Sequence, residues 1–214
     1  MVLVVPKVRG LLSSALTGAL ALGSVALTGW QVEQVEMTKA RDPFPTDGLP
    51  HKGASPQDAR VAMVACSEFQ CPFSGRARHT VEQLLVDNPD LAFFYTHLPL
   101  RSHRYAELHA RASVAAQRQG RFWPMHDALY DSQRETKVVD EAAAIALARD
   151  LGLDTGRFAE DLRDPTTAAE VRRQSRLCTD QGVRAVPTFF INGREVRGAL
   201  PTEEFQRVID EVRG

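Results

Sequence analysis

The sequence predicts an α/β fold in which a helical segment interrupts a β-sheet. Residues 61–66 are apolar without alternation, which is typical of a central strand covered on both faces. A helical pattern over residues 75–87 and a β-rich run over residues 91–97 follow, and this order implies parallel, right-handed pairing of the two strands. Residues 103–181 contain no strand candidate, so we expect them to form an insertion before the sheet resumes over residues 187–191.

Local signals divide the rest of the folded chain into elements. Asn88-Pro89 ends the first helix, and Asn192-Gly193 predicts a hairpin whose second strand returns over residues 195–197. Thr202 is expected to cap a final helix. The insertion contains five stretches with helical patterning, over residues 105–119, 122–131, 140–151, 155–162 and 166–181.

Length and composition are those of an ordinary globular protein. The chain has 214 residues, of which 43% are hydrophobic and 25% charged, and this suits one core with an elaboration. A formal net charge of −1 without a basic cluster argues against a nucleic-acid-binding protein. Three cysteines are too few for a disulfide framework, and an odd number leaves at least one thiol unpaired within the chain.

Residues 1–30 have the pattern of a targeting segment. Lys7 and Arg9 precede residues 10–30, which carry no charge. This pattern predicts a signal peptide, with an uncleaved membrane anchor as the alternative, so the folded part is expected to be exported. Residues 31–56 are polar and rich in proline, which predicts a linker with at most a short strand and a domain that starts near Pro56.

Cys71 is the main candidate for chemistry. Pro72 suits the first position of a helix, which places the sulfur of Cys71 at the helix N-terminus. Free backbone N–H groups and the helix dipole favour a thiolate there, so we expect an accessible, nucleophilic sulfur. The alternative is an inert cysteine beside a turn.

Three segments resemble the DsbA-like branch of the thioredoxin superfamily. The segment Ser67-Glu-Phe-Gln-Cys-Pro-Phe-Ser74 resembles the active-site segment of that family. Residues 182–193 resemble its cis-proline loop and the strand and hairpin that follow. Residues 120–127 resemble the start of a helix in its helical domain. The resemblance implies a periplasmic thiol:disulfide oxidoreductase or isomerase that acts on protein thiols and disulfides. It also implies a thioredoxin-like domain formed by residues 57–102 and 182–214. A helical domain formed by residues 103–181 would be inserted into it.

The resemblance implies roles for residues around Cys71. The family carries a second cysteine where this chain has Ser74, whose hydroxyl is expected to donate a hydrogen bond to the thiolate but cannot form a disulfide. Cys71 would then act alone, through mixed disulfides that an external thiol must release. Glu68 matches the acidic position of the family behind the active site and is interpreted as a proton relay, with a solvated loop carboxylate as the alternative.

A substrate groove is expected beside the sulfur. The resemblance implies a cis bond between Val186 and Pro187 and a loop that faces Cys71. Ala185 and Val186 would offer backbone groups to an extended substrate segment, while Pro72 and Phe73 would border it.

The remaining cysteines and the histidines favour structural roles. Cys66 is interpreted as a small core residue, with a role as partner of Cys71 as the alternative. Cys178 is interpreted as an inert thiol, with an intermolecular disulfide as the alternative. None of the six histidines shows the spacing of metal ligands, so we expect no metal and no bound cofactor, with glutathione as a possible co-substrate.

Two other functions stay open from the sequence. Kappa-class glutathione transferases share this architecture and have a serine near the equivalent turn, although Cys71 and the targeting segment argue against them. A non-catalytic binding module that has kept the substrate groove is the other.

Overall fold

The sheet has five strands, and β2 lies at its centre. The computed structural model describes residues 43–214, so the targeting segment expected over residues 1–30 lies outside the described part. β2 and β3 are parallel, as predicted, and the other neighbouring pairs are antiparallel. The strand order is β1-β3-β2-β4-β5, formed by His51–Gly53, Leu91–His97, Val61–Ser67, Thr188–Ile191 and Arg194–Arg197.

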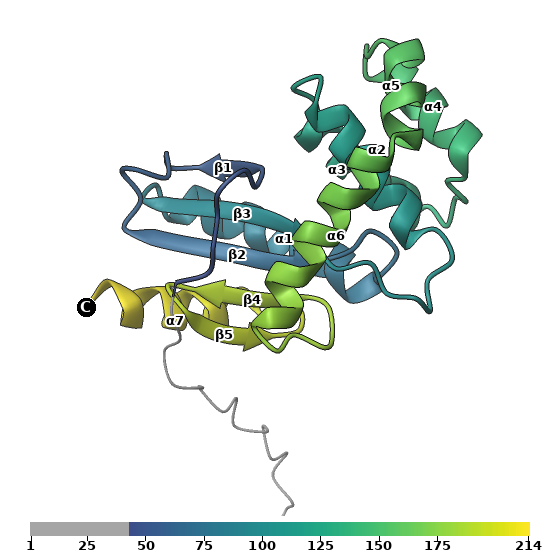
Figure 1. The fold of residues 1–214 in the computed structure, drawn as a ribbon. Coiled ribbons are helices and arrows are strands. Elements are labelled where there is room, and N and C mark those ends of the chain that lie inside the picture. Colours follow the sequence, from purple (N-terminus) through teal and green to yellow (C-terminus); the bar gives the residue numbers. More distant parts are fainter. Residues whose placement is uncertain (1–42) are drawn as a thin grey trace, which may run out of the picture. The chain divides into compact units, whose positions relative to one another are not determined.

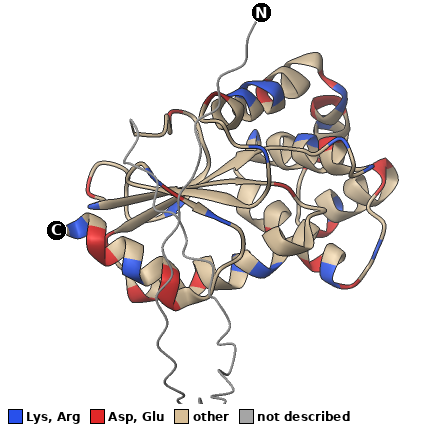
Figure 2. Cartoon of the chain, turned by 90° about the horizontal axis from the view of Figure 1, so that it is seen from below, with Lys and Arg blue, Asp and Glu red and all other residues tan. Residues whose placement is uncertain are grey.

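Both faces of β2 are covered, as its continuous apolar run predicted. Met63 and Ala65 pack in the larger core, together with buried residues of α1 (Pro72–Asp87) and α7 (Thr202–Arg213). Val64 and Cys66 pack in a second core, beneath the C-terminal half of α6 (Pro165–Asp180). Figure 2 shows the consequence for charge, because lysine, arginine and carboxylate residues gather on helices and loops while the central strands are largely free of them.

The insertion is helical, and its five predicted helices are confirmed. α6 leaves the group of helices and runs back across β3 towards β4, so it connects the insertion to the sheet (Figure 1). Asp140, Asp154 and Asp164 cap three of these helices by accepting backbone N–H bonds. Before α6 come α2, α3, α4 and α5, formed by Ala106–Gln117, Phe122–Arg134, Glu141–Asp150 and Thr155–Arg163.

The fold begins before Pro56, where the sequence placed the start of the domain. β1 pairs with β3, and Leu49 is buried. The ring of Phe44 lies 5.2 Å from that of Phe190 in the second core. These apolar residues stand singly among prolines and polar residues, so no periodicity marks them in the sequence.

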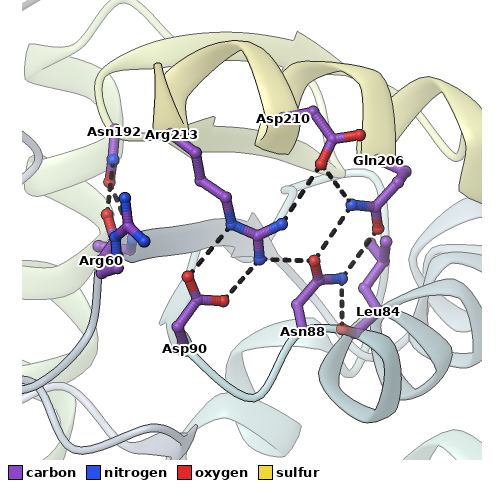
Figure 3. Close-up of polar contacts among 9 residues, drawn as sticks. Arg60, Leu84, Asn88, Asp90, Asn192, Gln206, Asp210 and Arg213 are labelled. Atoms are coloured by element: carbon purple, nitrogen blue, oxygen red, sulfur yellow. Dashed lines mark hydrogen bonds and ion pairs between the residues drawn. The ribbon is translucent and has the colours of Figure 1, made fainter.

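A polar network anchors α7 to the turn between α1 and β3 (Figure 3). Arg213 at the end of α7 pairs with Asp90 at 2.5 Å and donates to Asn88 at 2.6 Å. The Arg213 guanidinium lowers the pKa of the Asp90 carboxyl. Thr202 is the first residue of α7 and not its cap, because Pro201 takes that position without a side-chain hydrogen bond.

Cys66 and Cys178 form a disulfide, a pairing that the sequence analysis did not predict. The bond joins β2 to α6 across a sequence separation of 112 residues, and both cysteines are fully buried in the second core. Cys66 is a buried core residue, as predicted, but the interpretation of Cys178 as an inert thiol and the alternative pairing of Cys66 with Cys71 were wrong. The fold, and not the sequence spacing, brings Cys66 and Cys178 together. Cys71 is therefore the one free cysteine of the chain.

Candidate active site

Cys71 is the N-cap residue of α1, as the sequence predicted. Pro72 occupies the first helical position, and the N–H of Gly75 donates to the Cys71 carbonyl at 3.1 Å. The expected accessible sulfur is not found, because Cys71 is only 5% exposed. A loop of the same chain covers it: Cys71 Sγ lies 3.5 Å from the carbonyl oxygen of Val186.

The covering segment is the proline loop, residues 182–187. Its Val186–Pro187 peptide bond is cis, which confirms the prediction from the resemblance. The loop is fixed at its end by two hydrogen bonds, from Thr188 Oγ1 to the Ala185 carbonyl and from the Gly198 N–H to the Pro187 carbonyl, both 2.8 Å long. Ala185 is exposed and Val186 half-buried, so this edge stays open to another chain.

Ser74 does not form the expected hydrogen bond with Cys71. It is the third residue of α1 and 3% exposed, and its hydroxyl has no hydrogen-bond partner within residues 43–214. The side chain lines a cavity of about 20 Å³ that Ser67 and Tyr130 also line. A cavity of this size holds about one water molecule, which could satisfy the hydroxyl.

Glu68 is buried beneath the active-site turn and is not a solvated loop carboxylate. It is 1% exposed, accepts the Gln70 N–H at 2.9 Å and contacts Nδ1 of His103. Burial raises the pKa of the Glu68 carboxyl, while the Gln70 and Cys71 N–H groups and His103 oppose that rise. His103 lies in the loop between β3 and α2, and its pairing with Glu68 has no signal in the sequence.

A cluster of hydroxyls behind the turn was also missed by sequence reasoning. Tyr130 OH lies 3.0 Å from Ser67 Oγ and 3.1 Å from Tyr95 OH, and it donates to the Glu68 carbonyl at 3.3 Å. Burial raises the pKa of both tyrosines, so they remain neutral hydroxyls. Tyr130 lies on α3, so the helical insertion contributes directly to the site.

Two further contacts from the insertion hold the active-site turn. Gln133 of α3 donates its side-chain N–H to the Phe69 carbonyl at 2.7 Å. The backbone N–H of Tyr105 donates to the side chain of Gln70 at 2.5 Å. The position of Cys71 relative to the proline loop therefore depends on both parts of the fold.

The surface beside Cys71 is formed by the residues expected to border a substrate. Phe73 is 54% exposed, the guanidinium of Arg76 stacks on its ring at 4.4 Å, and Pro72 is exposed. A groove of about 370 Å³ begins at Pro72 and runs between α1 and α3. A second groove, of about 460 Å³, follows the proline loop.

The three buried histidines have polar partners within the protein. His97 contacts Ser113, His109 contacts the Val139 carbonyl, and His126 contacts Asp127. Within residues 43–214, no group of three or more His, Cys, Asp or Glu side chains is arranged to hold a metal ion. In the same part of the chain, no helix is long and apolar enough to cross a membrane.

Comparison with known proteins agrees with this architecture. A family model described as a DSBA-like thioredoxin domain matches residues 63–210. The structure is similar to a thioredoxin-like oxidoreductase from Silicibacter pomeroyi DSS-3, with 25% identity, a TM-score of 0.67 and coverage of 77% of this chain and 92% of that one. It is also similar to BdbD from Bacillus subtilis, with 20% identity, a TM-score of 0.72 and coverage of 81% and 97%.

Curated relatives are much longer proteins. The chain is 36% identical over 155 residues to the Na⁺/H⁺ antiporter NhaA 3 of Salinispora tropica, which is 72% of this chain and 23% of that protein. It is 30% identical over 190 residues to the NhaA antiporter of Herminiimonas arsenicoxydans, which is 88% of this chain and 30% of that protein. The chain thus spans less than a third of the length of these relatives.

Proposed function

Since this chain belongs to the family of DSBA-like thioredoxin domains, we propose that it carries out thiol–disulfide exchange through the single thiol of Cys71. The observation that carries the proposal is the position of Cys71, which is free, caps α1 and faces the cis-proline loop. The thiolate of a cysteine is the form that attacks a disulfide.

The exchange proceeds in two steps. The Cys71 thiolate attacks one sulfur of a substrate disulfide, the substrate S–S bond breaks, and the departing thiolate takes a proton from solvent. The product is a mixed disulfide on Cys71. Ser74 has no sulfur with which to displace the substrate. A second thiolate from outside the chain must therefore attack the substrate sulfur of the mixed disulfide; a new S–S bond forms between these two sulfurs, and Cys71 leaves as a thiolate.

Proton transfer at this site would involve Glu68. Its carboxyl has a raised pKa, and the Cys71 N–H is among the groups that stabilise its charged form. His103 contacts the carboxyl and is itself partly exposed, with 31% of its side chain accessible. We propose that this pair carries the Cys71 proton between the buried turn and solvent, as a relay.

The substrate would be an extended segment of another protein, bound along the proline loop. Ala185 and Val186 lie at its open edge and would pair with the main chain of the substrate, which tolerates varied sequences. Pro72 and Phe73 would border the opposite side. Glutathione or a partner protein would supply the second thiol.

We propose that the domain works after export, in an oxidising compartment such as a periplasm. The Cys66–Cys178 disulfide supports this location, because disulfides persist in oxidising compartments and are rare in the cytosol. The targeting segment expected over residues 1–30 points the same way, whether it is cleaved or retained as an anchor.

The burial of Cys71 favours a second candidate function, that of a binding module without catalytic turnover. The two functions differ in one assay, in which the protein is incubated with a scrambled disulfide protein and a small thiol, and recovery of native disulfides is followed. If the protein is an enzyme, we expect native disulfides to be recovered faster than with the matched Cys71→Ser variant. Equal rates for the two proteins would favour the binding module.

A further inference from the structure

We infer that the Cys71 site prefers anionic disulfides, among them glutathione disulfide, because arginines from four segments (α1, α3, the proline loop and the loop before α2) lie around it and outnumber the exposed carboxylates. The inference rests on the proposed exchange at Cys71 and adds the charge of the substrate. The net charge of the whole chain is −1, so a positive site is a local property and does not follow from composition.

The first group of arginines lines the groove that begins at Pro72. Arg76 is exposed and contacts the Phe73 ring, and it forms no ion pair with another described residue. Arg134 is 69% exposed, and its carboxylate neighbour Asp131 is 3.9 Å away. Asp131 already pairs with Arg78 at 3.1 Å. Arg78 also pairs with Glu82 at 3.3 Å, so Arg76 and Arg134 supply the excess positive charge of this groove.

The second group is a single arginine on the proline loop, the segment that covers the sulfur. Arg184 is exposed and lines the groove along the loop, two residues before the Val186 carbonyl that contacts Cys71. No carboxylate pairs with it within residues 43–214. The other charged residues of this groove, Arg197 and Glu195, pair with each other at 2.7 Å.

The third group flanks the partner of Glu68. Arg101 and Arg104 are exposed on either side of His103, and Arg104 lies 5.1 Å from the Tyr105 ring. Glu68 is buried against His103, and Glu107 is one exposed carboxylate against the two arginines.

Such an arrangement raises the local concentration of anions and gives their carboxylates bidentate partners. Glutathione disulfide carries more carboxylate than ammonium groups and has an accessible S–S bond. In the inferred step, the Cys71 thiolate forms a bond to one glutathione sulfur, the other glutathione leaves as a thiolate, and that thiolate takes a proton from solvent. No external oxidant or reductant is consumed, because one disulfide replaces another.

The test compares disulfides that differ in charge. The rate of mixed-disulfide formation on Cys71 is measured by intact mass for glutathione disulfide, dithiodipropionate, neutral hydroxyethyl disulfide and cationic cystamine. Each rate is divided by that of the same disulfide with a small neutral thiol. At low ionic strength we expect both anionic disulfides to react about tenfold faster than cystamine. High salt should bring the relative rates together, because the Debye length falls from about 30 Å at 0.01 M to about 3 Å at 1 M.

Charge reversal provides the matched comparison. Arg76→Glu with Arg184→Glu should slow the anionic disulfides, speed cystamine and leave hydroxyethyl disulfide unchanged, and the Arg76→Gln, Arg184→Gln variant should show a smaller effect of the same sign. Arg149→Glu, at an exposed arginine on α4, is the control and should change none of the ratios.

The outcomes separate the inference from the proposed function. Adducts with hydroxyethyl disulfide but no charge preference, or a preference for glutathione disulfide without one for dithiodipropionate, would overturn the inference and leave thiol exchange standing. No adduct with any of the disulfides would overturn both.

Discussion

Cys66 and Cys178 are joined by a disulfide that ties the strand entering the active-site turn to the helix that precedes the proline loop. Cys66 lies five residues before Cys71 in the sequence and is paired with Thr188 in the sheet. The covalent link therefore connects the two segments that bring Cys71 and Val186 together.

The disulfide is expected to stabilise the fold. Closing a loop of this length lowers the entropy of the unfolded chain, and removal of such a bond costs about 2–5 kcal/mol. We expect the Cys66→Ala, Cys178→Ala variant to lose this amount of unfolding free energy in urea denaturation without reductant. A reductant should destabilise the parent similarly and leave the variant unchanged. If reductant leaves the urea denaturation curve of the parent unchanged, at urea concentrations that unfold the protein and expose the bond, the disulfide is not present.

Ser74→Cys should restore a two-cysteine site. Ser74 is one helical turn from Cys71, and the cavity beside its hydroxyl leaves room for sulfur. We expect an intramolecular disulfide between the new cysteine and Cys71, and faster oxidation of a reduced test protein than by the parent. Ser74→Ala is the control and should give no gain. If mass spectrometry finds no such disulfide in the variant, Ser74 does not occupy the position of the second cysteine of the family.

The Glu68 and His103 pair should be energetically coupled. His103→Ala removes a hydrogen-bond partner from a buried carboxyl, which is expected to cost about 1–3 kcal/mol of unfolding free energy. Glu68→Gln combined with His103→Ala should cost less than the sum of the single changes. The double-mutant cycle is measured by urea denaturation at neutral pH, and strictly additive changes would show that the contact contributes nothing.

Stability should also depend on the protonation of His97. Burial lowers the pKa of His97 from 6.5 to about 3, with His126 adding to the shift and Glu170 opposing it. A lowered pKa means that the neutral imidazole supports the fold above pH 6.5, and that this support is lost as the pH falls towards 3. The stability difference between the parent and His97→Gln should thus shrink by up to about 1.4 kcal/mol per pH unit. A difference that stays constant between neutral and mildly acidic pH would contradict this.

The sequence predicted the parts of the fold that depend on local pattern. The apolar run of residues 61–66 marked the central strand, and Pro72 marked the helix start at Cys71. The cis bond before Pro187 was predicted from the resemblance and not from local pattern. Family resemblance therefore supplied what periodicity could not.

What the sequence did not predict depends on contacts between distant residues. The disulfide joins cysteines that are 112 residues apart, and no sequence pattern around either cysteine identifies the other as its partner. Glu68 and His103 meet because two loops lie side by side at the end of the parallel strands. The burial of Cys71 depends on Val186, which approaches only when β4 pairs with β2.

The most direct test of the account is to trap the mixed disulfide on Cys71. The oxidised parent protein, with Cys66 and Cys178 still bonded, is incubated with an excess of a small protein that carries one accessible disulfide, and the products are separated without reductant and mapped by peptide mass. We predict a covalent adduct linked through Cys71 that persists until a small thiol is added, and no adduct with Cys71→Ser. An adduct through Cys66 or Cys178, or no adduct on the parent, would contradict single-thiol exchange at Cys71.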